Sequence, residues 1–148
     1  MSETAADVLL ECLAEALQTF AFIAVEPAEG PMPAPAAAEL YTLRYAGRRA
    51  GEFQLAAPRE FGRLMAANLL GLEAGAGEAA ERAQDVILEL CNIITGLWLQ
   101  RSAAEDAPDM GLPMAGVLPD WERFAARPGA LAVRAEGFPL VARVEEAS

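Results

Sequence analysis

The sequence predicts a single α+β domain, residues 1–148, in which helices alternate with antiparallel hairpins. Apolar residues recur at helical spacing over residues 3–19, 58–70 and 78–101. Four alternating, β-prone runs are joined in pairs by short turns, 40–45 with 51–55 and 131–133 with 138–144. At 148 residues, of which 54% are hydrophobic, the chain can bury a core without disulfides.

The first helix is expected over residues 3–19. Ser2 or Thr4 can serve as its N-cap, and Asp7 is favourable near its positive end. Residues 20–25 form a short β-prone run. Residues 27–38 contain four prolines and no periodic pattern, which predicts a loop.

The later elements follow from turn residues. Pro58 suits the first turn of the second helix, and Gly71 suits the position just past its end. The other expected segments are a turn at 46–49, a small-residue linker at 74–77, the long helix at 78–101, a polar loop at 102–109, an extended stretch at 111–120, a helical turn at 121–126 and a hairpin turn at Glu136–Gly137.

Composition excludes several classes of function. The net charge of −11 disfavours nucleic acid and anionic membranes as partners and tolerates a partner with a basic rim. The chain has no histidine, which removes Ser-His-Asp catalysis and most zinc sites. All 11 basic residues are arginine, so lysine chemistry is absent too.

The cysteines and the N-terminus indicate a cytoplasmic protein. Cys12 and Cys91 lie in apolar helical stretches and are expected to be buried, reduced thiols. No basic segment precedes an apolar run at the N-terminus, so no secretory signal is expected. The longest apolar run, near residues 93–99, is too short to span a membrane.

The long helix is apolar around most of its circumference, which predicts burial on most sides. The narrow polar gap holds Asp85, Glu89, Asn92 and Gly96. One interpretation is a solvated stripe on a buried helix, since burying an unpaired carboxylate is costly. The other is a docking face, because Asn and a mid-helix Gly are both poor helix formers that a solvated position does not require.

The chemistry of the docking interpretation follows from the two side chains. Glu89 and Asn92 are three residues apart and project side by side from a helix. Asn cannot be a general base, but its amide can hold a water by donating and accepting hydrogen bonds. Amides position water in this way in phosphoryl transfer, where catalysis is mostly positioning and charge stabilisation.

A faint internal repeat links the two halves. Residues 9–14, Leu-Leu-Glu-Cys-Leu-Ala, align with residues 87–92, Ile-Leu-Glu-Leu-Cys-Asn, and β-prone segments follow each helix. This pattern predicts a duplicated unit of helix and sheet.

Residues 85–96, Asp-Val-Ile-Leu-Glu-Leu-Cys-Asn-Ile-Ile-Thr-Gly, resemble the signature helix of the CheC/CheX/FliY chemotaxis phosphatases. The family pattern is Glu-x-x-Asn, commonly with glycine four residues later, and Glu89, Asn92 and Gly96 match it. The order of elements also resembles a CheX-like domain over most of the chain. The resemblance implies two long helices packed on a six-stranded, mostly antiparallel sheet built from two pseudo-repeats.

The resemblance also implies a function in two-component signalling. Asn92 would orient the water that attacks the aspartyl phosphate of a phosphorylated CheY-like receiver domain, and Glu89 would pair with the lysine of that receiver. Asp85 and Gly96 would contact the partner. No cofactor or metal of its own is implied, because Mg²⁺ belongs to the receiver. A homodimer through sheet edges is an assembly that the resemblance suggests.

The chain departs from the family pattern in two places. Ala14 stands where a second asparagine would sit after Glu11, which leaves one site, as in CheX-like members. Leu97 and Trp98 follow Gly96, where the family often has a polar residue.

Two alternatives remain open beside the phosphatase. The same face could dock a response regulator or another signalling partner without turnover. The stripe could also be solvated only, on a structural oligomer unit. Other residues have structural interpretations: Trp98 and Trp121 as core, Asn68 as a structural hydrogen bonder, Arg48 and Arg49 as solvated turn residues, and Asp106 and Asp109 as loop acids unsuited to calcium.

Overall fold

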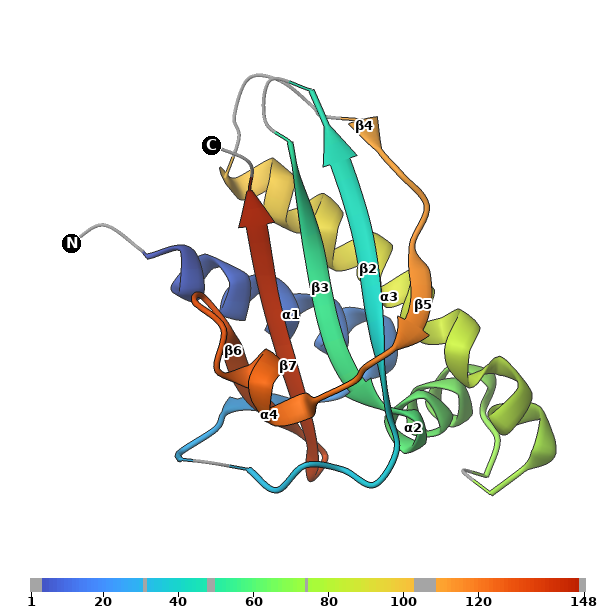
Figure 1. The fold of residues 1–148 in the computed structure, drawn as a ribbon. Coiled ribbons are helices and arrows are strands. Elements are labelled where there is room, and N and C mark those ends of the chain that lie inside the picture. Colours follow the sequence, from blue (N-terminus) through green and yellow to red (C-terminus); the bar gives the residue numbers. More distant parts are fainter. Residues whose placement is uncertain (1–3, 31, 48–49, 74, 103–108, 147–148) are drawn as a thin grey trace.

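The computed structural model describes residues 4–30, 32–47, 50–73, 75–102 and 109–146, and these ranges hold four helices and seven strands (Figure 1). The elements are α1 (Ala5–Ala21), β1 (Val25–Pro27), β2 (Ala38–Ala46), β3 (Gly51–Pro58), α2 (Arg59–Leu70), α3 (Gly77–Ser102), β4 (Asp109–Met110), β5 (Met114–Val117), α4 (Trp121–Ala125), β6 (Leu131–Ala135) and β7 (Phe138–Glu146). The α+β class is therefore confirmed.

The strands form one antiparallel sheet in the order β1-β6-β7-β3-β2-β4. β5 also pairs with β2, so β4 and β5 share one edge position. The seven strands thus occupy the six positions that the resemblance implied.

The sheet order displays the internal repeat. The hairpins β2–β3 and β6–β7 meet at the centre through the β3–β7 pair. Each edge strand pairs with the hairpin of the other half, β1 with β6 and β4–β5 with β2. Exchange of the edge strands ties the two halves into one sheet.

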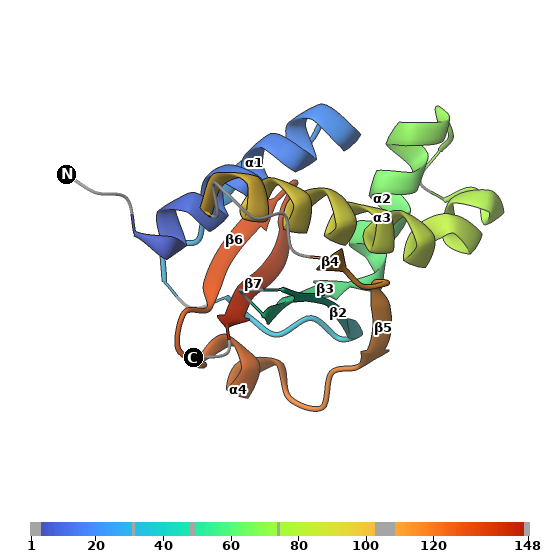
Figure 2. The same cartoon turned by 90° about the horizontal axis from the view of Figure 1, so that it is seen from above.

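Three helices cover one face of the sheet, and α4 lies on the other (Figure 2). The main core lies under α1, α2 and α3 and contains inward side chains of the central strands, including Tyr41, Phe53, Leu55 and Leu140. A smaller cluster under α4 joins Trp121 and Phe124 to Ala56 and Val141. Both tryptophans, Trp98 and Trp121, are buried, as predicted.

The N-terminus of α1 follows the prediction closely. Thr4 is the N-cap, and its side chain and that of Asp7 form a reciprocal capping box. The hydrogen bond to Thr4 holds the pKa of the Asp7 carboxyl below its usual value. Ser2, the other candidate cap, lies outside the described residues.

The C-terminus of α1 differs from the prediction. Phe20 and Ala21 complete the helix instead of starting a strand, because Leu17 and Ala21 both bury on its inner face. Phe22 then adopts a left-handed backbone with φ of 58°, and the amide of Ile23 donates to the carbonyl of Leu17 at 3.0 Å. The strand β1 is confined to Val25–Pro27.

The remaining ends lie at, or within one residue of, the positions that the turn signals predicted. Pro58 stands one residue before the helix, as the N-cap of α2, and Gly71 ends that helix with φ of 68°. Glu136 and Gly137, with φ of 51° and 83°, make the turn between β6 and β7. Arg48, Arg49 and Asp106 lie outside the described residues.

Candidate functional site

One face of α3 is closed by the core and the opposite face is open. Ile87, Leu90, Cys91 and Ile94 are fully buried against the sheet and α1. Asp85 and Glu89 are exposed, and Asn92 and Gly96 are partly exposed. These four residues, called the α3 stripe below, therefore lie together on the solvent side of the helix, as the helical wheel predicts.

The polar members of the α3 stripe have no partners within the described chain. Neither Glu89 nor Asn92 makes a side-chain hydrogen bond or ion pair with another described residue, whereas neighbouring polar residues on α3 do. Gln84 donates to Glu39 of β2 at 3.2 Å, and Arg101 pairs with Glu15 of α1 at 2.7 Å. The free carboxylate and amide are thus available to a second molecule.

Gly96 is not required by packing within the chain. A Cβ built at Gly96 would meet no atom within 4 Å. By contrast, a Cβ at Gly62 would lie 2.6 Å from the carbonyl oxygen of Ala83, so that glycine is needed where α2 crosses α3. The space over Gly96 is open surface, one turn beyond Asn92.

The helix that carries the α3 stripe is held rigidly. Its inner side chains belong to the main core, and the contacts of Gln84 and Arg101 anchor it near both ends. Leu97 is partly buried against this core, and Trp98 is 5% exposed. The two departures from the family pattern therefore serve the core, and the stripe keeps a fixed geometry.

The first helix presents the degenerate counterpart of this face. Glu11 is exposed and Ala14 is partly buried, on the side of α1 away from the core. The aligned segment thus has the same orientation as the stripe but lacks its amide. Only the α3 face carries the carboxylate–amide pair.

Other candidate residues serve the structure. Cys12 and Cys91 are buried and free, and burial raises the pKa of both thiols. Asn68 donates to the carbonyl of Ala21 at 3.0 Å and links α2 to the end of α1, as predicted. Asp109 is exposed.

The residues that the structure describes contain neither a metal-binding cluster nor a membrane-spanning helix. No group of three or more Cys, Asp or Glu side chains there could hold a metal ion. No helix among them is long and apolar enough to cross a membrane.

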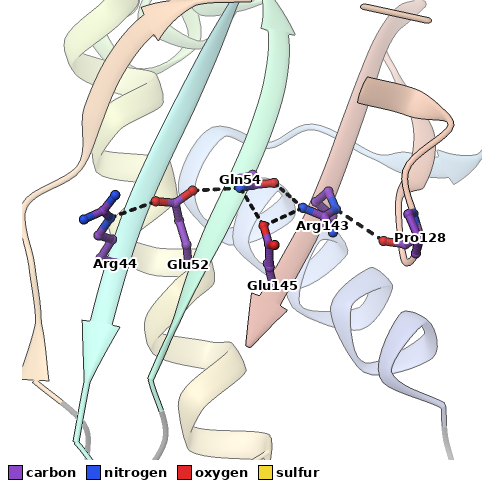
Figure 3. Close-up of polar contacts among 6 residues, drawn as sticks. All are labelled: Arg44, Glu52, Gln54, Pro128, Arg143 and Glu145. Atoms are coloured by element: carbon purple, nitrogen blue, oxygen red, sulfur yellow. Dashed lines mark hydrogen bonds and ion pairs between the residues drawn. The ribbon is translucent and has the colours of Figure 1, made fainter. Parts of the chain in front are cut away.

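The sequence did not reveal a polar network on the sheet face opposite α3 (Figure 3). Arg143, 7% exposed, donates to Gln54 Oε1 at 2.7 Å, to Glu145 at 3.0 Å and to the carbonyl oxygen of Pro128 at 3.3 Å. Gln54 donates in turn to Glu52, which pairs with Arg44. Alternation placed Gln54 and Arg143 on predicted strands, but no local signal pairs these two positions.

A second feature outside the prediction is the apolar edge of the sheet. Four large side chains on or between β4 and β5 are exposed: Met110, Leu112, Met114 and Val117. The signal in the sequence is the run of residues 110–119, which contains no charged residue although 22% of the chain is charged.

A pocket of about 390 Å³ lies between residues 34–39 and 118–122. No stripe residue lines it. The α3 stripe is instead a convex helix face, a shape that suits a macromolecular partner better than an enclosed small molecule.

No protein-family model and no curated protein sequence matches this chain. Solved structures match it along nearly all of its length. A chain of the CheX–CheY–BeF3–Mg²⁺ complex from Borrelia burgdorferi has a TM-score of 0.71 and 16% identity, over 98% of this chain and 99% of that chain. CheX from Vibrio vulnificus has a TM-score of 0.70 and 17% identity, over 99% and 100%.

A CheC-like superfamily protein from Shewanella sp. PV-4 has a TM-score of 0.69 and 15% identity, over the whole of both chains. Identities of 15–17% show a fold and nothing finer. This chain has the fold shared by CheX and CheC-like proteins of chemotaxis.

Proposed function

We propose that this protein is a phosphatase that stimulates hydrolysis of the aspartyl phosphate on a CheY-like receiver domain. The observation that carries the proposal is the α3 stripe: Glu89 is exposed and Asn92 partly exposed, neither pairs with a described residue, and both lie beside the open surface over Gly96. A structurally similar chain was solved together with CheY, BeF3 and Mg²⁺, which supports a receiver domain as the partner.

Asn92 would act on water. Its amide oxygen accepts a hydrogen bond from the water, and its NH₂ group donates to the phosphoryl group, so the water oxygen is aimed at phosphorus. The new P–O bond forms as the bond from phosphorus to the aspartate oxygen breaks. The aspartate leaves as a carboxylate, and the protons of the water go to inorganic phosphate and solvent.

Glu89 would hold the receiver in register. Its exposed carboxylate fits a cation on the partner, which the family resemblance identifies as the lysine of the receiver site. Asp85 adds a second negative charge one turn away, and Gly96 allows close approach of the partner backbone. Mg²⁺ in the receiver neutralises charge on the phosphoryl group, so this chain needs no metal for the step.

The experiment is the decay of acyl phosphate on a CheY-like receiver domain, with this protein present at a tenth of the receiver concentration or less. The phosphatase account expects decay of the whole receiver population to accelerate, because each molecule turns over many receivers. Unchanged decay across several receivers from the same cell would contradict it.

Two alternatives have distinct outcomes in the same experiment. A docking module without turnover would bind the phosphorylated receiver and leave its lifetime unchanged. The Glu11–Ala14 segment of α1 supports this alternative, because it keeps the carboxylate and lacks the amide, so a site of this kind can be lost. If the stripe is only solvated, Glu89→Ala and Asn92→Ala will leave both binding and decay unaltered.

A further inference from the structure

The edge of the sheet beside α3 carries an exposed apolar strip, defined by Met110, Leu112, Met114 and Val117. Val117 is 84% exposed and Met114 is 67% exposed. Asp109 and Asp120 bound the strip, and no charged residue lies between them. This uncharged, apolar segment differs markedly from the rest of the chain, whose net charge is −11.

Strand register decides which of these side chains face α3. Val117 pairs with Glu39, whose carboxylate accepts a hydrogen bond from Gln84 of α3. Met110 pairs with Tyr45, which lies in the core beneath the helices. Because paired residues project to the same side of a sheet, Val117 and Met110 lie on the α3 side.

Met114 lies on the other side of the same strand. It pairs with Thr42, between the inward residues Tyr41 and Leu43, so it projects to the face opposite α3. Ala115, next to Met114, packs on the main core. The edge therefore offers exposed apolar side chains to both faces, and only one of these faces adjoins the stripe.

The open flank of α3 is the one toward this edge. Ala83, which contacts α2 at Gly62, and Arg101, which pairs with Glu15 of α1, are each nine residues from Asn92. Nine residues are about two and a half helical turns, so both lie on the side of α3 opposite Asn92. Asn92 is therefore turned away from α1 and α2, and β4 and β5 lie along the other flank of α3 (Figure 2).

We propose that the receiver docks on the α3 stripe and on Val117 and Met110 together, so that these two apolar side chains set receiver affinity while Asn92 does the chemistry. This inference rests on the proposed function. The partner chemistry that fits is an apolar patch beside a cation, the cation facing Glu89 and the patch facing Val117. Uncharged side chains at an interface core supply affinity, and the neighbouring charges supply register.

A second copy of this chain fits the strip less well. The edge is broken into strands of two and four residues by Gly111–Pro113, and a proline and a short edge both disfavour strand addition. A sheet continued across this edge would also bring two acidic α3 stripes onto the same face.

The test is the dissociation constant of a CheY-like receiver loaded with beryllofluoride and Mg²⁺, measured by titration against the full chain. Val117→Glu and Val117→Lys should each weaken binding about tenfold or more, because each places a charge against an apolar patch. Met114→Glu, on the opposite face of the same strand, is the matched control and should leave the dissociation constant unchanged. Thermal unfolding of each variant verifies the fold.

The outcomes separate this inference from the proposed function. If wild-type protein accelerates decay but both Val117 variants bind normally, the docking surface is wrong and the phosphatase stands. If wild-type protein binds without accelerating decay, the phosphatase is wrong and the titration still decides the surface. Weakening by Val117→Glu alone would show a charge effect and overturn the apolar contact. Loss of a dimer on sedimentation, with normal receiver binding, would assign the strip to a second copy.

Discussion

At the scale of single residues, position on α3 determines which polar groups are free. Gln84 and Arg101 lie where the helix meets β2 and α1, and each finds a partner there. Glu89 and Asn92 lie on the face of the helix turned away from the core, where neither pairs with a described residue. The helical wheel predicted the position of Glu89 and Asn92 from spacing alone, because ten apolar residues in the central part of the helix leave only one narrow polar gap.

The substitution Gly96→Ala tests whether the α3 stripe is kept open for a partner. Gly96→Ala should raise the free energy of unfolding by about 0.5–1 kcal/mol, because alanine is the better helix former and its Cβ meets nothing within 4 Å. The same substitution should weaken receiver binding if the partner backbone comes close there. Urea unfolding and receiver titration measure the two effects.

Gly62→Ala is the matched control for a glycine required by packing. Its Cβ would press on the carbonyl of Ala83, so the free energy of unfolding should fall by about 1–3 kcal/mol. A Gly96→Ala variant that lost stability like Gly62→Ala would show that the surface over Gly96 is not open.

At the scale of elements, local patterns predicted helices and hairpins better than their ends and their distant contacts. The core-facing periodicity and Gly71 gave α2 and α3 almost to the residue. The end of α1 was wrong because Phe20 to Val25 are all strand-compatible, and burial of Ala21 against the core decided for helix. The broken β4–β5 edge depends on pairing with β2 across more than sixty residues, which spacing does not encode.

The polar network around Arg143 is seen only in the structure, and it leads to a prediction about stability that the sequence alone could not give. Arg143→Met should lower the free energy of unfolding by about 2–3 kcal/mol, because it leaves Gln54 Oε1 and the Pro128 carbonyl without their donor in a buried site. Chemical denaturation at neutral pH measures the change.

Arg44→Met is the control on the same network. The Arg44 side chain is 86% exposed, so its pair with Glu52 should contribute no more than about 0.5 kcal/mol. Equal costs for the two substitutions would mean that burial of Arg143 adds nothing to the network.

At the scale of the whole molecule, the acid excess makes stability depend on pH. Hydrogen bonding from Arg143, and then its charge, hold the pKa of Glu145 below its ordinary value. A depressed native pKa contributes stability above the pKa of the unfolded chain, and this contribution is lost as pH falls through the native pKa. Stability should therefore decline below about pH 4.5, the ordinary value for this carboxyl.

Glu145→Gln isolates that contribution. The variant keeps a hydrogen-bonding group and nearly the same net charge, so changes in overall repulsion largely cancel in the comparison. Urea unfolding between pH 3 and 7 should show a shallower loss of stability in the variant than in the wild-type protein. Identical slopes would assign the pH dependence to other carboxyls.

The whole fold places one carboxylate–amide pair on a rigid, open helix, and the central claim is that this amide positions water. The most direct measurement compares wild-type protein with Asn92→Ala for both receiver binding and acceleration of acyl-phosphate decay. The account predicts an acceleration reduced by about 100-fold or more, with unchanged unfolding temperature and a dissociation constant within about a factor of three. An Asn92→Ala variant that accelerates decay as fast as the wild-type protein would contradict it.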